Sequence, residues 1–305
     1  MDISAKVRDG GRISPEEALE LCDNGALLEL GAAANERRQQ LNPGRRVTYL
    51  IDRNINYTNV CVTDCQFCNF YAPNATHPDA YVNSREVLAR KIKEALALGA
   101  TRILMQGGHN PDLPFDYYLE LLDWIRVAFP TIEINAFSPS EIEFMAAISG
   151  QSWLQVLTDL QAAGLSGLPG GGGEILDDEI RKRVSPKKIS TENWLGIMEV
   201  AHSLDLTTTA TMVIGLRENL QHRINHLHQL RQLQDRSLAA GSRGFNAFIS
   251  WPVQIEGTPL GRSKFREEYG ATPSEYLRHT AIARIFLDNV LHMAASWPTL
   301  GAKVG

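Results

Sequence analysis

The sequence predicts an α/β fold: a TIM-type (β/α) barrel of parallel strands, preceded by N-terminal helices and lacking its last strand-helix unit. Strand-like and helix-like segments alternate along most of the 305 residues, and each connection from strand to helix is short. The length also suits a single barrel, which takes roughly 250 residues. An open doubly wound sheet is the alternative, but it normally needs fewer strand-helix units.

The N-terminal region, residues 1–45, is predicted to be a helical extension. Ser14 can cap a helix that begins with Pro15, and Glu17 can reach back to that cap. Cys22 falls inside this helix, and we expect it to be a small core residue without a chemical role.

The rest of the chain, residues 46–305, carries the barrel pattern. Helical periodicity of apolar residues alternates there with short runs rich in β-branched and apolar residues. The expected extended runs are 47–51, 56–60, 102–105, 132–137, 165–169, 207–214, 245–251 and 292–297. The expected helices lie around 85–98, 118–125, 153–163, 177–184, 192–204, 220–230 and 274–290. A closed eight-fold barrel needs one further strand and helix, so we expect an incomplete barrel.

Composition argues against several classes of protein. The chain is 44% hydrophobic and 21% charged, which is typical of soluble globular proteins. A formal net charge of -5 argues against nucleic-acid binding, because a phosphate backbone needs a concentrated Lys/Arg surface. We find neither a signal peptide nor an apolar run long enough to cross a bilayer. We therefore expect a cytoplasmic protein without a membrane partner.

Three of the four cysteines, Cys61, Cys65 and Cys68, form a C-x3-C-x2-C motif directly after a predicted strand. Three thiolates from one loop can hold a 4Fe-4S cluster and leave one iron open for the amino and carboxylate groups of S-adenosyl-L-methionine. An electron passed from the cluster to the sulfonium would then release the 5'-deoxyadenosyl radical, which abstracts hydrogen. The position at a strand's carboxyl end, where barrel active sites lie, favours this hypothesis.

Two other metal sites stay open. A structural zinc ion needs a fourth ligand, and His77 is close enough in sequence to supply it. An electron-carrier cluster needs a fourth cysteine, for which only the remote Cys22 remains. Either site would make the chain a zinc or iron-sulfur binding protein without catalysis.

Together with its surroundings, the motif resembles radical S-adenosylmethionine (radical SAM) enzymes, and among them the dehypoxanthine futalosine cyclases of menaquinone biosynthesis. The similarity lies in segments 52–60, 105–114, 136–141, 168–174 and 183–187. It implies a radical SAM barrel, a small nucleoside-derived substrate and a flavodoxin or ferredoxin electron donor. It also implies hydrogen abstraction at ribose C4' and ring closure onto the aromatic ring. Aminofutalosine synthase and the deazaflavin-forming synthase subunit, which makes the F420 precursor, are the nearest alternatives.

Several residues of these segments are candidates for the cofactor site. Phe67 would shield the cluster and lie near the adenine, with plain core packing as the alternative. Gln106, Gly107 and Gly108 end the second strand, where glycine lets the backbone approach the methionine amino group, although a tight turn explains them equally well.

The third and fourth strand ends carry further candidates. Ser138 and Glu141 are expected to face the ligands, Ser138 in the cofactor site, although Glu141 also suits the first turn of the next helix. Glycines 170–173 suggest backbone held against a ligand, and Glu174 could then bind the cofactor ribose or amino groups.

Basic side chains near the barrel mouth complete the set. Arg183, or Arg181, could meet a carboxylate bidentately, with an exposed helix face as the alternative. His109 is a candidate general base for a final proton loss, although a plain surface-loop histidine is the alternative.

Overall fold

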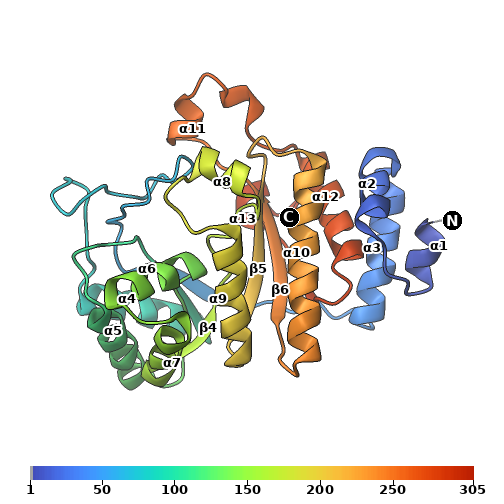
Figure 1. Cartoon of the computed structure of the whole chain (residues 1–305). Helices are drawn as coiled ribbons and strands as arrows, with labels where there is room; N and C mark the ends of the chain where they lie inside the picture. Colours follow the sequence, from blue (N-terminus) through green and yellow to red (C-terminus); the bar gives the residue numbers. More distant parts are fainter. Residues whose placement is uncertain (1–2) are drawn as a thin grey trace.

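The computed structural model describes residues 3–305 and places seven parallel strands in one sheet, in the order β1-β2-β3-β4-β5-β6-β7. The sheet curls into part of a barrel with helices outside it, and β1 and β7 form its two edges (Figure 1). The predicted α/β barrel is therefore confirmed, including the seventh strand. Met1 and Asp2, which belong to the predicted extension, lie outside the described residues.

The strands are short, as expected when successive connections are helical crossovers. They are β1 Asp52–Asn56, β2 Arg102–Gln106, β3 Glu133–Ala136, β4 Leu165–Leu168, β5 Thr207–Ile214, β6 Phe245–Pro252 and β7 His292–Ala294. Strands β5 and β6 share the longest register, from Thr208 opposite Phe245 to Ile214 opposite Pro252. β5 is buried along most of its length, whereas burial alternates along β6, so one face of β6 stays partly exposed.

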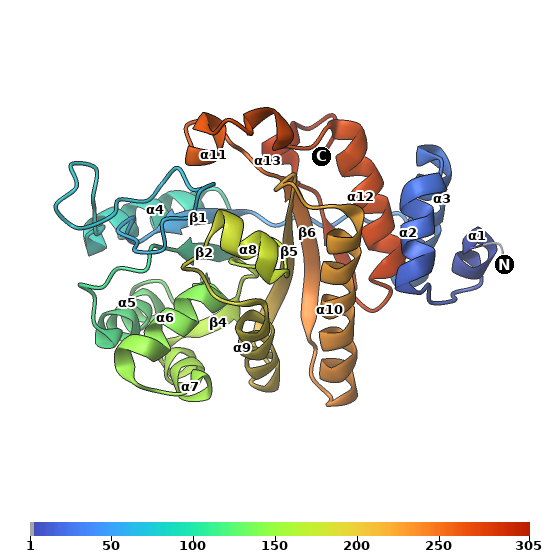
Figure 2. The same ribbon diagram turned by 45° about the horizontal axis from the view of Figure 1, so that its top comes forward.

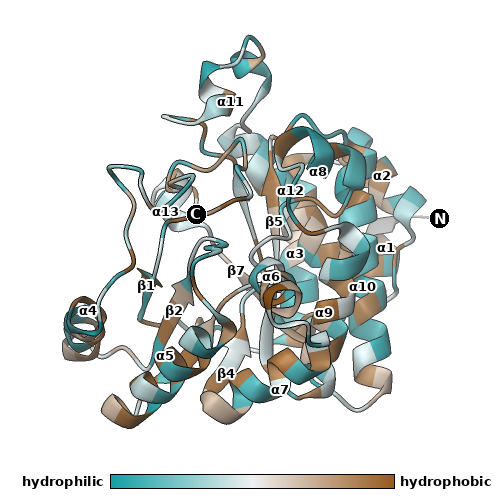
Figure 3. Cartoon of the chain, turned by 60° about the vertical axis from the view of Figure 1, so that its left-hand side comes forward, coloured by the Kyte–Doolittle hydropathy of each residue, from teal (hydrophilic) through white to brown (hydrophobic). Residues whose placement is uncertain are grey.

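Helices surround the outer face of the sheet and its carboxyl end, and helices α7, α9 and α10 carry both hydrophobic and hydrophilic faces (Figure 3). They are α4 Arg85–Ala97, α5 Phe115–Ala128, α6 Pro139–Ser149, α7 Trp153–Ala163, α8 Asp178–Val184, α9 Thr191–Ser203, α10 Leu220–Ala239, α11 Pro259–Arg262, a 3-10 helix Arg266–Glu268, α12 Pro273–Phe286 and α13 Trp297–Leu300. No helix among residues 3–305 combines the length and the apolar character that a membrane crossing requires.

Several predicted boundaries were wrong; the last strand, for example, ends at Ala294 rather than 297, and α13 begins at Trp297. Residues 47–51 form no strand, because the side chains of Val47 and Tyr49 are 86% and 87% exposed and β1 begins only at Asp52. An apolar run without a neighbouring strand or a buried face has nothing to hold it in a sheet. In the second run, 56–60, only Asn56 belongs to β1. The last predicted helix ends at Phe286 rather than 290.

The N-terminal helices α1 Ile3–Arg8, α2 Pro15–Asn24 and α3 Leu27–Leu41 lie beside α10 and α12. The predicted capping box is confirmed: the Glu17 amide donates to the Ser14 hydroxyl (3.2 Å), and the Ser14 amide donates to the Glu17 carboxylate (2.7 Å). Cys22 is 9% exposed and belongs to the core, as expected.

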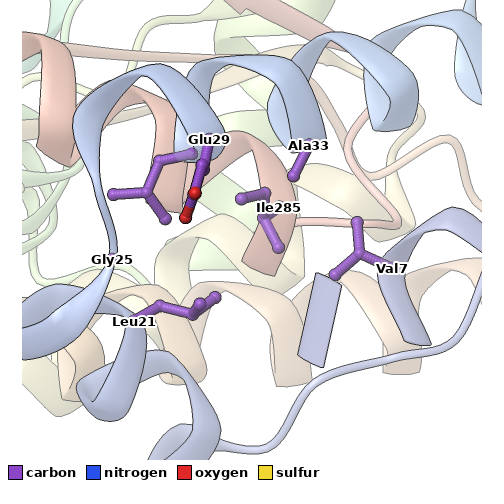
Figure 4. A pocket seen from close by; sticks show the side chains of 7 residues that line it. Val7, Leu21, Gly25, Glu29, Ala33 and Ile285 are labelled. Carbon is purple, nitrogen blue, oxygen red and sulfur yellow. The ribbon is translucent and has the colours of Figure 1, made fainter. Parts of the chain in front are cut away.

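A small cavity lies where these helices meet α12, lined by Val7, Leu21, Ala33 and Ile285 among others (Figure 4). Its volume of about 20 Å³ has room for about one water molecule. None of the cysteines of the motif lines this cavity, so the cavity does not mark the candidate functional site.

Candidate active site

The cysteine motif lies in the segment between β1 and α4, at the carboxyl end of the sheet (Figure 2). This connection runs from residue 57 to residue 84, so the prediction that each connection from strand to helix is short was wrong here. Backbone hydrogen bonds tie it to three other segments of that end. The Val62 amide donates to the His109 carbonyl (3.2 Å), the Gln66 amide to the Val184 carbonyl (2.8 Å), and the Leu260 amide to the Gln66 carbonyl (3.1 Å). The loop is thereby held against the end of β2, the end of α8 and the start of α11.

The three cysteines of the loop are free thiols with different exposures. Cys65 is 5% exposed, whereas Cys61 and Cys68 are partly exposed. The Thr63 hydroxyl lies 2.9 Å from the Cys61 sulfur and 3.6 Å from the Cys65 sulfur, and the Cys68 amide donates to the Cys65 carbonyl (3.0 Å). Thr63, which the sequence did not single out, therefore ties two of the sulfurs together.

This donor set fits an iron-sulfur cluster. The three thiols come from one loop that is buried on one side and open on the other, which suits a cluster whose fourth iron faces a ligand. Across residues 3–305, no three His, Cys, Asp or Glu side chains converge on a single ion position. Each thiolate of a cluster binds a different iron and needs no such convergence, whereas the ligands of one zinc ion do.

Gly107 and Gly108, directly after β2, pack so closely against neighbouring residues that no side chain fits at either position. A Cβ on Gly107 would lie 2.5 Å from the Tyr57 ring, and a Cβ on Gly108 would lie 2.7 Å from the Cys61 Cβ and collide with the Val60 carbonyl. Their amides are already paired, Gly107 with Glu141 (2.9 Å) and Gly108 with the Thr58 carbonyl (3.1 Å). These two amides are therefore not available to a ligand, and the carbonyls of Gln106 and Gly108 already accept one hydrogen bond each, from Asn56 and Asn110.

Glu141 is the buried centre of a hydrogen-bond network at this end of the sheet. It lies in the first turn of α6, 3% exposed, so the helix-turn alternative for this residue was right. Its carboxylate accepts from the Tyr57 hydroxyl (2.9 Å), the Gly107 amide (2.9 Å) and the Ser138 hydroxyl (2.7 Å). Burial raises the pKa of Glu141 to about 7, against the opposing effect of these hydrogen bonds.

The glycine-rich loop after β4 contacts residues from two other strand ends. Side-chain atoms of Gln106 and Ser138 lie directly against Gly171, so the structure brings these three predicted residues together. The Thr211 hydroxyl donates to the Gly170 carbonyl. These close contacts are a sufficient reason for glycine at 170–173, without a ligand.

Arg181 holds the glycine-rich loop in place with its guanidinium group. Its side chain is buried, so the alternative of an exposed helix face was wrong. It is 4% exposed, and its guanidinium donates to the carbonyls of Gly172 (2.9 Å), Gly173 (3.1 Å) and Ile189 (2.6 Å). Arg183 is exposed and donates to the carbonyls of Leu216 (2.9 Å) and Arg217 (3.0 Å). Both guanidinium groups are therefore engaged with the backbone.

Glu174 ends the glycine loop and pairs with a lysine that sequence reasoning missed. Its Oε1 accepts from Lys188 Nζ (2.8 Å), and its buried Oε2 has no hydrogen-bond partner in the described chain. Lys188 Nζ also lies 5.6 Å from the centre of the Phe67 ring. Lys188 directly follows the quoted 183–187 segment, but a single sequence offers no sign that its side chain turns back to the cysteine loop.

His109 is buried, and its ring stacks on Phe144 with ring centres 5.0 Å apart. Burial lowers the pKa of His109 to about 3, and the charge of Lys188 adds to the effect. An imidazole with so low a pKa stays neutral and is a weak base, which argues against the prediction that His109 is the general base for the final proton loss.

Backbone strain gathers at the same end of the molecule. Asp64 in the cysteine loop, Phe137 after β3, Glu174 after β4 and Arg217 after β5 all have positive φ, between 24° and 65°. Such conformations are costly for residues with a Cβ and persist where the surroundings hold them, often at functional sites.

A curled parallel sheet with a three-cysteine loop at its carboxyl end defines the class of barrel enzymes that use an iron-sulfur cluster with S-adenosylmethionine. The chain belongs to the radical SAM superfamily, which it matches over residues 55–230, and residues 242–305 match the CofH/MqnC C-terminal region. The 4Fe-4S cluster and S-adenosylmethionine are the cofactors of this superfamily.

Curated relatives span nearly the whole chain. The cyclic dehypoxanthine futalosine synthase of Halalkalibacterium halodurans is 43% identical over 97% of this chain and 77% of its own length. The enzyme of the same name from Streptomyces coelicolor is 44% identical over 97% of this chain and 72% of its own length. A 5-amino-6-(D-ribitylamino)uracil–L-tyrosine 4-hydroxyphenyl transferase from Cyanothece sp. is 38% identical over 97% of this chain and 80% of its own length.

Solved structures support the fold. Methylornithine synthase (PylB) superposes with a TM-score of 0.73 at 17% identity, covering 99% of this chain and 81% of its own. The hydrogenase maturase HydG superposes with a TM-score of 0.72 at 16% identity, covering 96% of this chain and 62% of its own.

Proposed function

We propose that the chain is a radical SAM cyclase that converts dehypoxanthine futalosine to cyclic dehypoxanthine futalosine in menaquinone biosynthesis. The observation that carries this proposal is the 43–44% identity to two cyclic dehypoxanthine futalosine synthases, which extends over 97% of the chain. The aligned region includes nearly all of the site described above. We further propose a cytoplasmic location, a division into a helical extension at 1–45 and a barrel at 46–305, and a flavodoxin or ferredoxin electron donor.

In this proposal Cys61, Cys65 and Cys68 hold the 4Fe-4S cluster. When bound and reduced, the cluster supplies an electron to S-adenosylmethionine, and the adenosyl group so released takes hydrogen from ribose C4' of the substrate. The partial exposure of Cys61 and Cys68 leaves that side of the loop open to a donor and to the ligand.

The other residues bind and orient the ligands. In this proposal the methionine ammonium donates to carbonyls of the turn formed by Gln106, Gly107 and Gly108, since the two glycine amides are already paired within the protein. The carbonyls of Gln106 and Gly108 each accept one hydrogen bond from an asparagine and have a second lone pair for the ligand. Glu174 Oε2 lies 3.8 Å from Arg181 Nη1 but accepts no hydrogen bond within the described residues, so in this proposal it accepts from ribose hydroxyls. Phe67 offers its ring to the adenine.

Ser138 and Arg183 have narrower roles than the sequence suggested. Ser138 caps α6 and bonds to Glu141, so we propose that it shapes the wall of the cofactor site beside Gly171. Arg183 holds the segment after β5 in place through its carbonyl contacts and lies at the edge of the site. The buried, neutral His109 forms part of the wall of the site, and in this proposal its ring keeps water away from the reacting atoms.

The proposed function is tested by a substrate comparison on one protein preparation. The protein is reconstituted with iron and sulfide without oxygen, reduced, and given S-adenosylmethionine with dehypoxanthine futalosine. In a parallel reaction it receives 5-amino-6-(D-ribitylamino)uracil and L-tyrosine, the substrates named by the relatives that are about 38% identical.

We expect a product of dehypoxanthine futalosine that has lost two hydrogens, because ring closure replaces two C–H bonds with one C–C bond. The second reaction should leave its substrates unchanged. Turnover in the second reaction alone would contradict the proposal and assign the transferase activity instead.

A further inference from the structure

Lys188 is a largely buried cation in the middle of the candidate site. Its side chain is 15% exposed, and it reaches over the glycine loop, with Cε 3.6 Å from the position a Cβ would take on Gly172. Its Nζ lies 2.8 Å from Glu174 Oε1 and 5.6 Å from the centre of the Phe67 ring. One ammonium group therefore faces both the end of β4 and the cysteine loop.

The position of Lys188 brings its charge close to the cluster loop. Phe67, whose ring centre lies 5.6 Å from Lys188 Nζ, is the residue directly before Cys68 and two residues after Cys65. The Glu174 carboxylate pairs with Lys188 at 2.8 Å and also lies 3.8 Å from a guanidinium nitrogen of Arg181. Two cations therefore share one carboxylate, which leaves an excess of positive charge beside the cluster loop.

Neighbouring Lys187 has the same charge but a different environment. Its side chain is 60% exposed, and Nζ pairs with the Asp64 carboxylate of the cysteine loop at 2.7 Å. Water screens such an exposed pair, whereas a charge inside the protein acts through a medium of lower polarizability. The two adjacent lysines thus form a matched pair, one buried and one exposed.

We propose that Lys188 is a positioning residue that sets the reduction potential of the 4Fe-4S cluster, its ammonium stabilising the reduced form. This inference rests on the proposed assignment of the three cysteines to the cluster. One electron enters the cluster from the external reductant, and Lys188 neither gains nor loses a proton or electron. A fixed positive charge nearby favours the state that carries one more negative charge, so its removal makes reduction harder.

The test is an anaerobic potentiometric titration of the reconstituted holoprotein, with dithionite as reductant and EPR of the reduced cluster as the readout. Wild type is compared with Lys188→Met, Lys188→Arg and Glu174→Gln, and Lys187→Met is the exposed control. The measurement is made without S-adenosylmethionine or substrate, so it does not depend on turnover.

Lys188→Met should lower the equilibrium constant for one-electron reduction about tenfold, a fall of about 59 mV in potential. Lys188→Arg keeps the positive charge and should therefore keep most of the wild-type reduction potential. Lys187→Met should change the equilibrium constant for reduction less than about twofold. Glu174→Gln should raise the potential, because it removes the opposing charge. Because Glu174→Gln keeps Lys188, it tests the inference even if Lys188→Met fails to assemble a cluster.

Equal potentials in Lys188→Met, Lys187→Met and wild type would overturn the inference, as would a lower potential in Glu174→Gln. A wild-type protein that forms no 4Fe-4S cluster would contradict the proposed function and this inference together. A normal cluster with unshifted potentials would contradict the inference alone.

Discussion

Replacing Glu141 with glutamine should change how the free energy of unfolding depends on pH. Burial raises the pKa of Glu141 to about 7 in the folded protein, from an ordinary value of 4.5. Between these two values the folded state binds more protons than the unfolded state. The contribution of Glu141 to stability is therefore full below about pH 4.5 and is lost as the pH rises through about 7.

The size of this effect follows from the two pKa values. The whole difference corresponds to about 3 kcal/mol, and about 2 kcal/mol of it falls between pH 5.5 and pH 8. Glutamine does not titrate, and its carbonyl can still accept from Gly107 and Tyr57. Over this range Glu141→Gln should become about 2 kcal/mol more stable relative to wild type.

Glu141→Ala is the matched disruption. It leaves the buried Gly107 amide and Tyr57 hydroxyl without an acceptor, which should cost about 2–6 kcal/mol at any pH in this range. Buried histidines such as His109 also titrate, so only differences between variants and wild type isolate Glu141.

The assay is urea unfolding of the anaerobic holoprotein, followed by fluorescence at several values between pH 5.5 and pH 8. A stability difference between wild type and Glu141→Gln that stays constant with pH would refute the assignment of a raised pKa to Glu141. A small cost for Glu141→Ala would refute the network itself.

Further variants test the cluster loop and the extension. Each alanine substitution of a cluster cysteine, Cys68→Ala for instance, should lower the iron bound after reconstitution and abolish the 4Fe-4S absorption. Cys22→Ala should keep both, and iron loss in Cys22→Ala would show that the ligand set is wrong. Gly108→Ala should impair cluster retention, because its Cβ would meet the Val60 carbonyl and Cys61. Gly31→Ala, in open space on α3, should keep the cluster and gain about 0.5–1 kcal/mol of stability; equal iron contents in the two variants would contradict the packing argument. Ser14→Ala should cost about 1 kcal/mol in urea unfolding without changing the iron content, and an unchanged midpoint would count against the cap.

The elements of the barrel were predictable from local patterns. Thr207–Ile214 is rich in β-branched residues and forms β5, and the Ser14 cap with Pro15 and Glu17 marks the start of α2. Such signals lie within a few residues of each other in the chain. The prediction of a strand at 47–51 was wrong because no neighbouring segment buries these apolar side chains. Local sequence does not show which segments become neighbours.

The sequence predicts a site only where its residues are adjacent in the chain. The three cysteines lie within one loop after a strand, so their number and position predict a cluster, with zinc and electron-carrier sites as the alternatives. Lys188 was missed because its position depends on contacts between two distant segments, the cysteine loop and the loop after α8. For Arg181 the sequence offered a ligand carboxylate or an exposed helix face, whereas the structure shows it buried against carbonyls of the glycine loop. The glycines of 170–173 suggested a ligand, and the structure shows close packing of the chain against them.

Removal of hydrogen from C4' of dehypoxanthine futalosine is the step that defines the proposed cyclase. Dehypoxanthine futalosine carrying deuterium at ribose C4' is incubated with the reconstituted, reduced protein and S-adenosylmethionine, and the 5'-deoxyadenosine formed is analysed by mass spectrometry. We predict one deuterium in the 5'-deoxyadenosine together with a cyclised product. Unlabelled 5'-deoxyadenosine alongside unchanged substrate would contradict this prediction.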